Sequence, residues 1–174
     1  KKSLDQRFRL LRKRSRGATE RHDSLEVVLT EAFSALSPAE NEALLRLSLC
    51  QSRFSEELAQ ELLSDLNELH IDLLEGLVDN GLLQSSSEKE MPFMVLGSVS
   101  SLAVKQADST RLGRAKQVYL QCISERVRAS KHVALEDLLS ASSSEGPLEL
   151  AYLCAFHAAV RCRRLGRMEV GRGL

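Results

Sequence analysis

The chain has 174 residues, of which 43% are hydrophobic and 28% charged, as expected of a globular protein with a sizeable core. Its net charge is zero, but Lys and Arg outnumber acids nine to two in residues 1–22 and eleven to six in 111–174, whereas acids lead sixteen to four in 23–110. No apolar run is long enough to cross a bilayer, so we expect no membrane partner. The absence of Trp and the 4% aromatic content argue against a nucleic-acid stacking surface.

Apolar spacing predicts a series of helices in the first half of the chain. A helix within 3–14 is followed by a break and then by a strongly amphipathic helix over 25–36, capped by Asp23 or Ser24. The motif Ser37-Pro38-Ala39-Glu40 predicts a capping box that begins the next helix. Ser55 caps a helix that reaches Leu66, and a further helix begins near Ile71 and ends at Asn80-Gly81.

A small β-hairpin is predicted next, from two short apolar pieces around a Ser-rich tip at 85–90. Helices followed by a two-stranded hairpin are the order of a winged helix. Further helices are expected from Val99 and over 110–130, and the Ser-rich stretch from Ser140 to Gly146 reads as a linker. The last helix has small residues on one face, which favours close packing in stacked helical hairpins: Ala151, Ala155, Ala158, Ala159 and Cys162.

The four cysteines are scattered and form no C-x-x-C pair, which predicts reduced thiols and a cytoplasmic location: Cys50, Cys122, Cys154 and Cys162. Cys154 and His157 have a metal-compatible spacing, but no second pair completes a site, so we predict a packing or surface role and no metal. A Cys–His nucleophile pair could in principle combine Cys122 or Cys154 with His132 or His157. The sequence marks neither a third group to orient such a pair nor an oxyanion site. We therefore predict no catalytic residue and no enzyme activity for the chain alone.

Several ordered motifs resemble one protein class. These are Leu4-x-x-Arg7-Phe8-x-Leu10-Leu11, Ala32-Phe33-x-x-Leu36-Ser37-x-x-Glu40, Leu44-Leu45-Arg46-Leu47-Ser48 and Leu73-Leu74-x-x-Leu77-Val78-x-x-Gly81-Leu82-Leu83. Together they resemble the STAND class of signal-transduction ATPases, in the "predicted ATPase" branch of MalT-like and SARP/LuxR-type regulators. Leu165-Gly166-Arg167-Met168-Glu169 looks like the loop of a tetratricopeptide unit. No G-x-x-x-x-G-K-[ST] phosphate loop is present, so the ATPase core itself is missing.

The resemblance implies a mainly α fold in four parts. Residues 1–22 would end an upstream helical subdomain, 23–104 would form a winged-helix-like domain, 105–146 would hold connecting helices and the Ser-rich linker, and 147–174 would begin a truncated tetratricopeptide-like array. It also implies that Arg21, His22, Leu96 and Gly97 lie near the nucleotide in the intact protein, with Leu96 and Gly97 where the class often has a His-Asp pair. ATP or ADP would bind only the full-length protein, and this chain would hold no cofactor.

The function that the resemblance implies is non-catalytic. The winged helix would restrain the upstream ATPase core, and the helical repeats would sense a partner or effector protein. The alternative is a DNA-binding winged helix, which the acid-rich helix at 55–66 disfavours because it would repel phosphates. A simple helical scaffold is a second alternative. The acid-rich helix faces are expected to be solvated, or to dock on a basic neighbouring domain.

Overall fold

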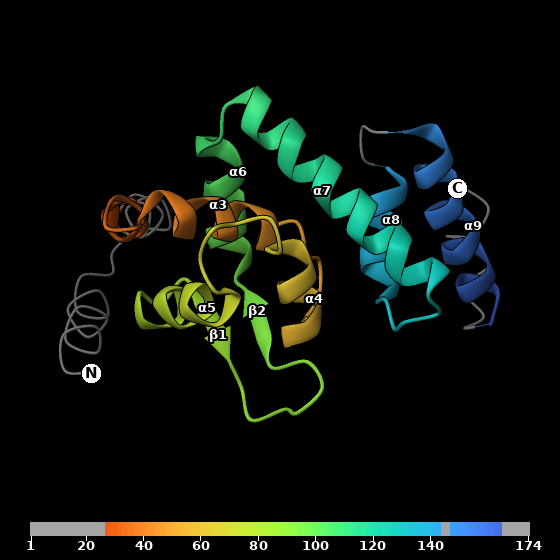
Figure 1. Ribbon diagram of the computed structural model, residues 1–174, viewed down its shortest axis with the longest axis horizontal. Helices are drawn as coiled ribbons and strands as arrows, with labels where there is room; N and C mark the ends of the chain where they lie inside the picture. Colours follow the sequence, from red (N-terminus) through yellow and green to blue (C-terminus); the bar gives the residue numbers. More distant parts are fainter. Residues whose placement is uncertain (1–26, 144–146, 165–174) are drawn as a thin grey trace, which may run out of the picture.

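The computed structural model describes residues 27–143 and 147–164, which are mainly helical with one small antiparallel sheet (Figure 1). The predicted mainly α class is confirmed at this level. Within the described residues, none of the helices combines the length and the apolar content that crossing a bilayer requires. The predictions for residues 1–22, including Arg21 and His22, and for 165–174 lie outside the described residues.

The first helices form a compact group, which we call the N-terminal unit, residues 27–106. A helix over 27–34 precedes α3 (Pro38–Leu47), α4 (Glu56–Leu62) and α5 (His70–Asp79). The predicted capping box is confirmed: the Glu40 N–H donates to Ser37 Oγ at 3.1 Å, and the Ser37 N–H donates to the Glu40 carboxylate at 2.8 Å. The apolar faces of these helices meet in a core whose fully buried members include Leu44, Leu47, Leu62, Leu63, Leu73, Leu74 and Leu77.

The predicted hairpin is confirmed and has an unpredicted third member. β1 (Leu83–Ser85) pairs antiparallel with β2 (Phe93–Val95), and Gly81, with φ of 71°, makes the left-handed turn after α5. Phe54, just before α4, bridges to Phe93 through two backbone hydrogen bonds of 2.9 and 3.2 Å. The order is therefore helix, strand-like contact, two helices and hairpin.

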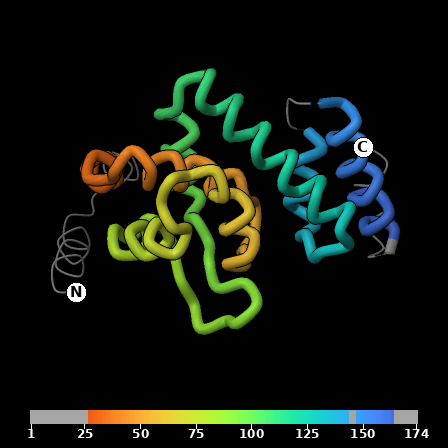
Figure 2. The backbone as a smooth tube through the Cα atoms, in the orientation of Figure 1, coloured from red at the N-terminus to blue at the C-terminus, as the bar shows by residue number. Residues whose placement is uncertain are grey.

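The second half of the described chain is built along one long helix. After α6 (Gly97–Gln106), α7 (Ser109–Arg128) runs past α3 and α4, and α8 (Leu135–Ser142) and α9 (Leu148–Arg164) pack on each other and on α7 (Figures 1 and 2). At 20 residues, α7 is about 30 Å long. The predicted linker start at Ser140 is wrong, because burial of Leu138 and Ala141 continues the helix through Ser142.

The two faces of α9 differ strongly. Cys154, Ala158 and Cys162 are fully buried, whereas Ala151, Ala155 and Ala159 of the predicted small-residue face are only partly buried. On the outer face, Leu148, Tyr152 and Phe156 are 85%, 73% and 57% exposed. These three side chains follow i, i+4, i+8 spacing, so α9 presents a continuous apolar stripe to solvent.

A left-handed serine ends α7 and gives a stability prediction. Ser130 has φ of 55°, and the next N–H, of Lys131, donates to Arg126 O at 2.9 Å, as in a Schellman ending. Glycine adopts this conformation without the Cβ penalty, so Ser130→Gly should raise the free energy of unfolding by about 1 kcal/mol in urea titration. Ser143→Gly, at the end of α8 with φ of −96°, is the control and should give no gain. Equal effects of the two changes would contradict the explanation.

Candidate functional site

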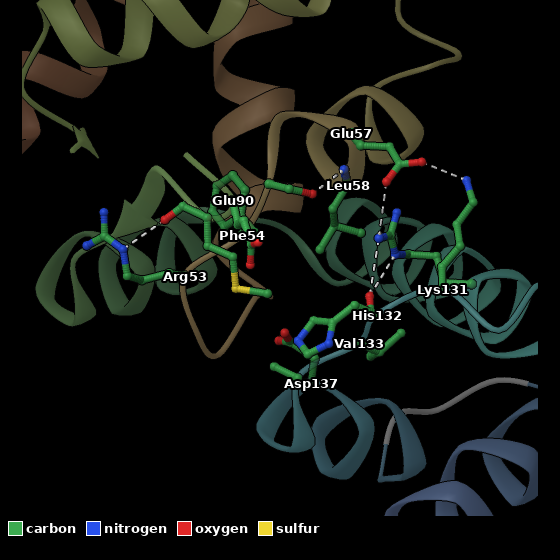
Figure 3. A pocket seen from close by; sticks show the side chains of 13 residues that line it. Arg53, Phe54, Glu57, Leu58, Glu90, Lys131, His132, Val133 and Asp137 are labelled. Carbon is green, nitrogen blue, oxygen red and sulfur yellow. Dashed lines mark hydrogen bonds and ion pairs between the residues drawn. The ribbon is translucent and has the colours of Figure 1, made fainter. Parts of the chain in front are cut away.

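A cleft of about 360 Å³ lies where the N-terminal unit meets the connection between α7 and α8 (Figure 3). One wall comes from residues 53–58, at the start of α4, and another from Glu90 and Met91 in the hairpin loop. The segment 131–134 and Asp137 of α8 form the opposite side. Segments more than 70 residues apart in sequence therefore converge here, and we call this place the joint.

Two carboxylates of α4 bind two cations of the α7 end at the joint. Arg126 Nη1 lies 2.8 Å from Glu61 Oε2, and Arg126 Nη2 lies 3.5 Å from Glu57 Oε2. Lys131 Nζ lies 2.9 Å from Glu57 and 2.7 Å from Glu61. Glu57 stays 55% exposed, as expected of a solvated face, whereas the Glu61 side chain is 28% exposed, and both acids pair with cations of the same chain.

The Arg126 guanidinium is the central member of this ion-pair cluster. Its side chain is only 6% exposed, and it also donates to the backbone O of His132 at 3.2 and 3.3 Å. Burial by itself would raise the pKa of Glu61, but the hydrogen bonds from Lys131 and Arg126 outweigh burial and lower it. The same two cations lower the pKa of Glu57 and hold the cluster in its charged form.

Asp137 forms the second set of polar contacts at the joint. Its carboxylate is 2% exposed and accepts from the Gln51 N–H at 2.7 Å, from Ser52 Oγ at 2.9 Å and from the Tyr119 hydroxyl at 3.0 Å. One buried acid therefore joins α8, α7 and the loop after α3. Burial, followed by the charge of Asp137, raises the pKa of Tyr119 well above its usual value, so the hydroxyl stays a donor.

Arg53 fixes the hairpin loop that forms the outer wall. Its guanidinium donates to Met91 O at 2.9 Å and Pro92 O at 2.7 Å, and it lies 3.2 Å from the Glu88 carboxylate. These contacts connect Arg53, the residue before the Phe54 bridge, to the loop that leads into β2. The charges that line the cleft are thus largely matched by partners within the chain, which suits a packing joint better than a reaction centre.

The cysteines are packed as inert thiols. Burial raises the pKa of Cys122 to about 12, aided by the nearby Glu61 carboxylate, which accepts from its thiol at 3.7 Å. Burial also raises the pKa of Cys154, whose sulfur lies 3.6 Å from Ser124 Oγ. His157, by contrast, is exposed and lies edge-on to Phe156. The proposed Cys–His spacing therefore does not bring Cys154 and His157 together.

Two of the four candidate nucleotide-proximal residues can be placed. Leu96 is the N-cap of α6, 37% exposed and outside β2, and a Cβ added at Gly97 would meet nothing within 4 Å. Leu96 therefore lies neither in the second strand nor in the core. Neither residue lines the joint cleft, and Arg21 and His22 lie outside the described residues.

Sequence reasoning did not single out the residues that make the joint. Glu57 and Glu61 showed only as part of an acidic helix face, and their partners lie about 65 to 74 residues further along the chain. A pairing at that separation depends on tertiary packing, for which the pattern along one helix carries no signal. Asp137 gave no separate sign, since Glu136 is a second acid in the same place between Leu135 and Leu138.

The ion-pair cluster predicts acid sensitivity. The pKa values of Glu57 and Glu61 lie below the ordinary glutamate value of 4.5 in the folded chain. Their contribution to stability is thus present above pH 4.5 and is lost as the pH falls through the lower folded values. In urea titrations from pH 7 to 3, Glu61→Gln should be less stable at pH 7 and converge with the parent at low pH. Parallel curves would contradict the assignment.

Comparisons with known proteins gave no match: no family model, no curated protein and no solved structure is similar enough to the chain to place it in a family. Within the described residues, no three His, Cys, Asp or Glu side chains gather in a way that could hold a metal ion.

Proposed function

We propose that the chain is a non-catalytic regulatory and protein-interaction module of a signal-transduction ATPase. In this proposal residues 23–104 form a winged-helix unit that restrains an ATPase core, and the helices that follow sense a partner protein. The order of α3, the Phe54 contact, α4, α5 and the hairpin supports the winged-helix interpretation. ATP or ADP would then be a ligand of the core and not of this chain.

The joint is the observation that carries the proposal. The helices α8 and α9 pack mainly on α7 and on each other, and the 131–137 segment reaches the N-terminal unit through the ion-pair cluster and Asp137. Each of these ion pairs and hydrogen bonds needs a specific partner, so the segment is either docked with all of them formed or undocked with all of them lost. Contacts of this kind suit an element with two alternative packings. A ligand or partner that bound one packing more tightly would shift the population between them.

The outer face of α9 supports a sensing role for the helices. Leu148, Tyr152 and Phe156 form an apolar stripe on a helix whose opposite face is already packed. Contiguous exposed apolar surface of this kind marks interaction sites, and in helical repeats it is covered by the next helix of the stack. The tetratricopeptide-like interpretation of α8 and α9 rests on this feature.

DNA binding is the weaker alternative. Because Phe54 supplies a strand-like contact before α4, the helix pair that resembles a helix-turn-helix is α4 and α5, and α5 would enter the groove. That helix carries Asp72, Glu75 and Asp79 and has no Lys or Arg. Fluorescence anisotropy with random duplex at low salt should show no binding through residues 55–79, and micromolar binding that depended on these residues would favour the alternative.

The test of the regulatory proposal separates the two sides of the joint by charge reversal. Glu57→Lys with Glu61→Lys places four cations together and should open the joint while α3, α5 and α9 stay folded. Hydrogen exchange should then speed up in 131–137 and 50–53, and small-angle scattering should show a larger radius of gyration. The exposed pair Glu68→Lys with Glu75→Lys makes the same charge change away from the joint and is the control. Cooperative loss of protection throughout the chain would instead favour a simple scaffold.

A further inference from the structure

A second cavity, of about 460 Å³, lies near the 130–133 segment, between the end of α7, α8 and α9. Lys131, His132 and Val133 line both this cavity and the joint cleft, so the short connection after α7 contributes to both. Cavities of this volume fall within the range that small organic ligands use. We call it the α7–α9 cavity.

The lining of the α7–α9 cavity has one sign of charge. Among the residues that the structure describes, its ionisable lining side chains are Lys131, His132, His157 and Arg161, with no acid among them. Lys131 already pairs with Glu57 and Glu61 at the joint, so the positive charge offered to a ligand is mainly that of Arg161. The joint cleft, by contrast, includes Glu57, Glu90 and Asp137 among its lining residues. The single-sign lining agrees with the basic excess of residues 111–174. Such a lining attracts an anion.

The remaining lining residues are mostly aliphatic and come from three helices. Val127 of α7, Leu138 of α8 and Val160 of α9 supply apolar surface beside the basic groups, and Ser130 supplies an exposed hydroxyl. Arg161 reaches from α9 to the backbone O of Val133, which positions its guanidinium at the connection. A guanidinium has five N–H donors, so this contact leaves others to meet a ligand.

We propose that the α7–α9 cavity binds an organic anion, with a carboxylate or phosphate group held by Arg161 and its basic neighbours and an aliphatic body on the valine and leucine surface. Arginine matches both head groups with paired donors, and burial of a short alkyl chain adds to affinity. This site lies away from Leu96 and Gly97 and does not depend on the regulatory proposal.

The first experiment asks which chemistry the cavity takes. The 174-residue chain is titrated with hexyl phosphate, hexanoate and neutral hexanol, by calorimetry and by amide NMR shifts. At least one of the anions should bind at least about tenfold more tightly than hexanol, which corresponds to one charge-assisted hydrogen bond, and should shift residues in 127–133 and 157–161. The stronger of the two anions identifies the head group. Equal binding of hexanol, or no anion binding at millimolar concentration, would overturn the proposal.

The second experiment locates the site, and its first variant removes no internal side-chain contact. Ser130→Asp adds a carboxylate at an exposed lining position, and Asp tolerates the left-handed backbone there. It should weaken anion binding about tenfold or more, whereas the uncharged match Ser130→Asn should not. Arg161→Met should also weaken binding, and Arg128→Met, an exposed arginine outside the cavity, should not. Unchanged affinity in Ser130→Asp would show that the anion binds elsewhere.

Discussion

Asp137→Ala should lower the free energy of unfolding by about 3 kcal/mol, because it leaves buried donors without an acceptor. The Tyr119 side chain is 1% exposed, and its hydroxyl and the Gln51 N–H both point at this carboxylate. Urea titration followed by circular dichroism measures the loss. Asp137→Asn keeps one oxygen acceptor and should cost less than the alanine change.

Two comparisons make this result specific to the buried acid. Glu75→Ala removes a carboxylate from an exposed helical position and should stay within about 0.5 kcal/mol of the parent. Tyr119→Phe combined with Asp137→Ala should cost less than the sum of the single changes, since both remove one shared hydrogen bond. A loss below 1 kcal/mol in Asp137→Ala would show that Asp137 does not hold the joint.

Arg126→Met should lower the free energy of unfolding by about 2–3 kcal/mol, since it leaves carboxylates in the joint with a single remaining cation. The methionine keeps much of the apolar stem, so the loss reports the guanidinium and not the packing. The His132 O would also lose its donors, and hydrogen exchange in 131–134 should speed up. The measurement is urea titration at pH 7.

The matched control for this change is Arg128→Met, which removes an exposed arginine from the same turn of α7. The double change Arg126→Met with Glu61→Gln should cost about 1–2 kcal/mol less than the two single losses added together, because the residues contact directly at 2.8 Å. Strict additivity would mean that Arg126 stabilises the chain by packing alone.

Local sequence chemistry predicted most of the helices but not how they meet. The capping box at Ser37 and Glu40 and the turn at Gly81 depend on residues within one or two turns, so their patterns are complete in the sequence. The hairpin was predicted for the same reason. The Phe54 bridge was missed because a single pair of backbone hydrogen bonds needs no side-chain pattern.

The joint was missed for a different reason. Arg126 and Glu61 belong to helices that each read as ordinary amphipathic segments, and only the approach of α4 and α7 makes them partners. The resemblance drew attention to Leu96 and Gly97, which the structure places at the exposed start of α6. Long-range polar contacts thus decide where the candidate site lies, whereas periodicity along the chain predicts only the elements.

The two attachments of α7 to the N-terminal unit impose a condition on its length. Arg111 Nη2 lies 3.4 Å from Glu42 on α3, and Arg126 binds α4 fifteen residues later. Fifteen residues of α-helix span about 22 Å and slightly more than four turns, so both side chains emerge on nearly the same side. One inserted residue between them would rotate the far end by about 100° and carry α8 and α9 with it. A four-residue insertion would nearly restore the rotation but add about 6 Å. The length of α7 therefore sets both the relative rotation of its two ends and the distance between them.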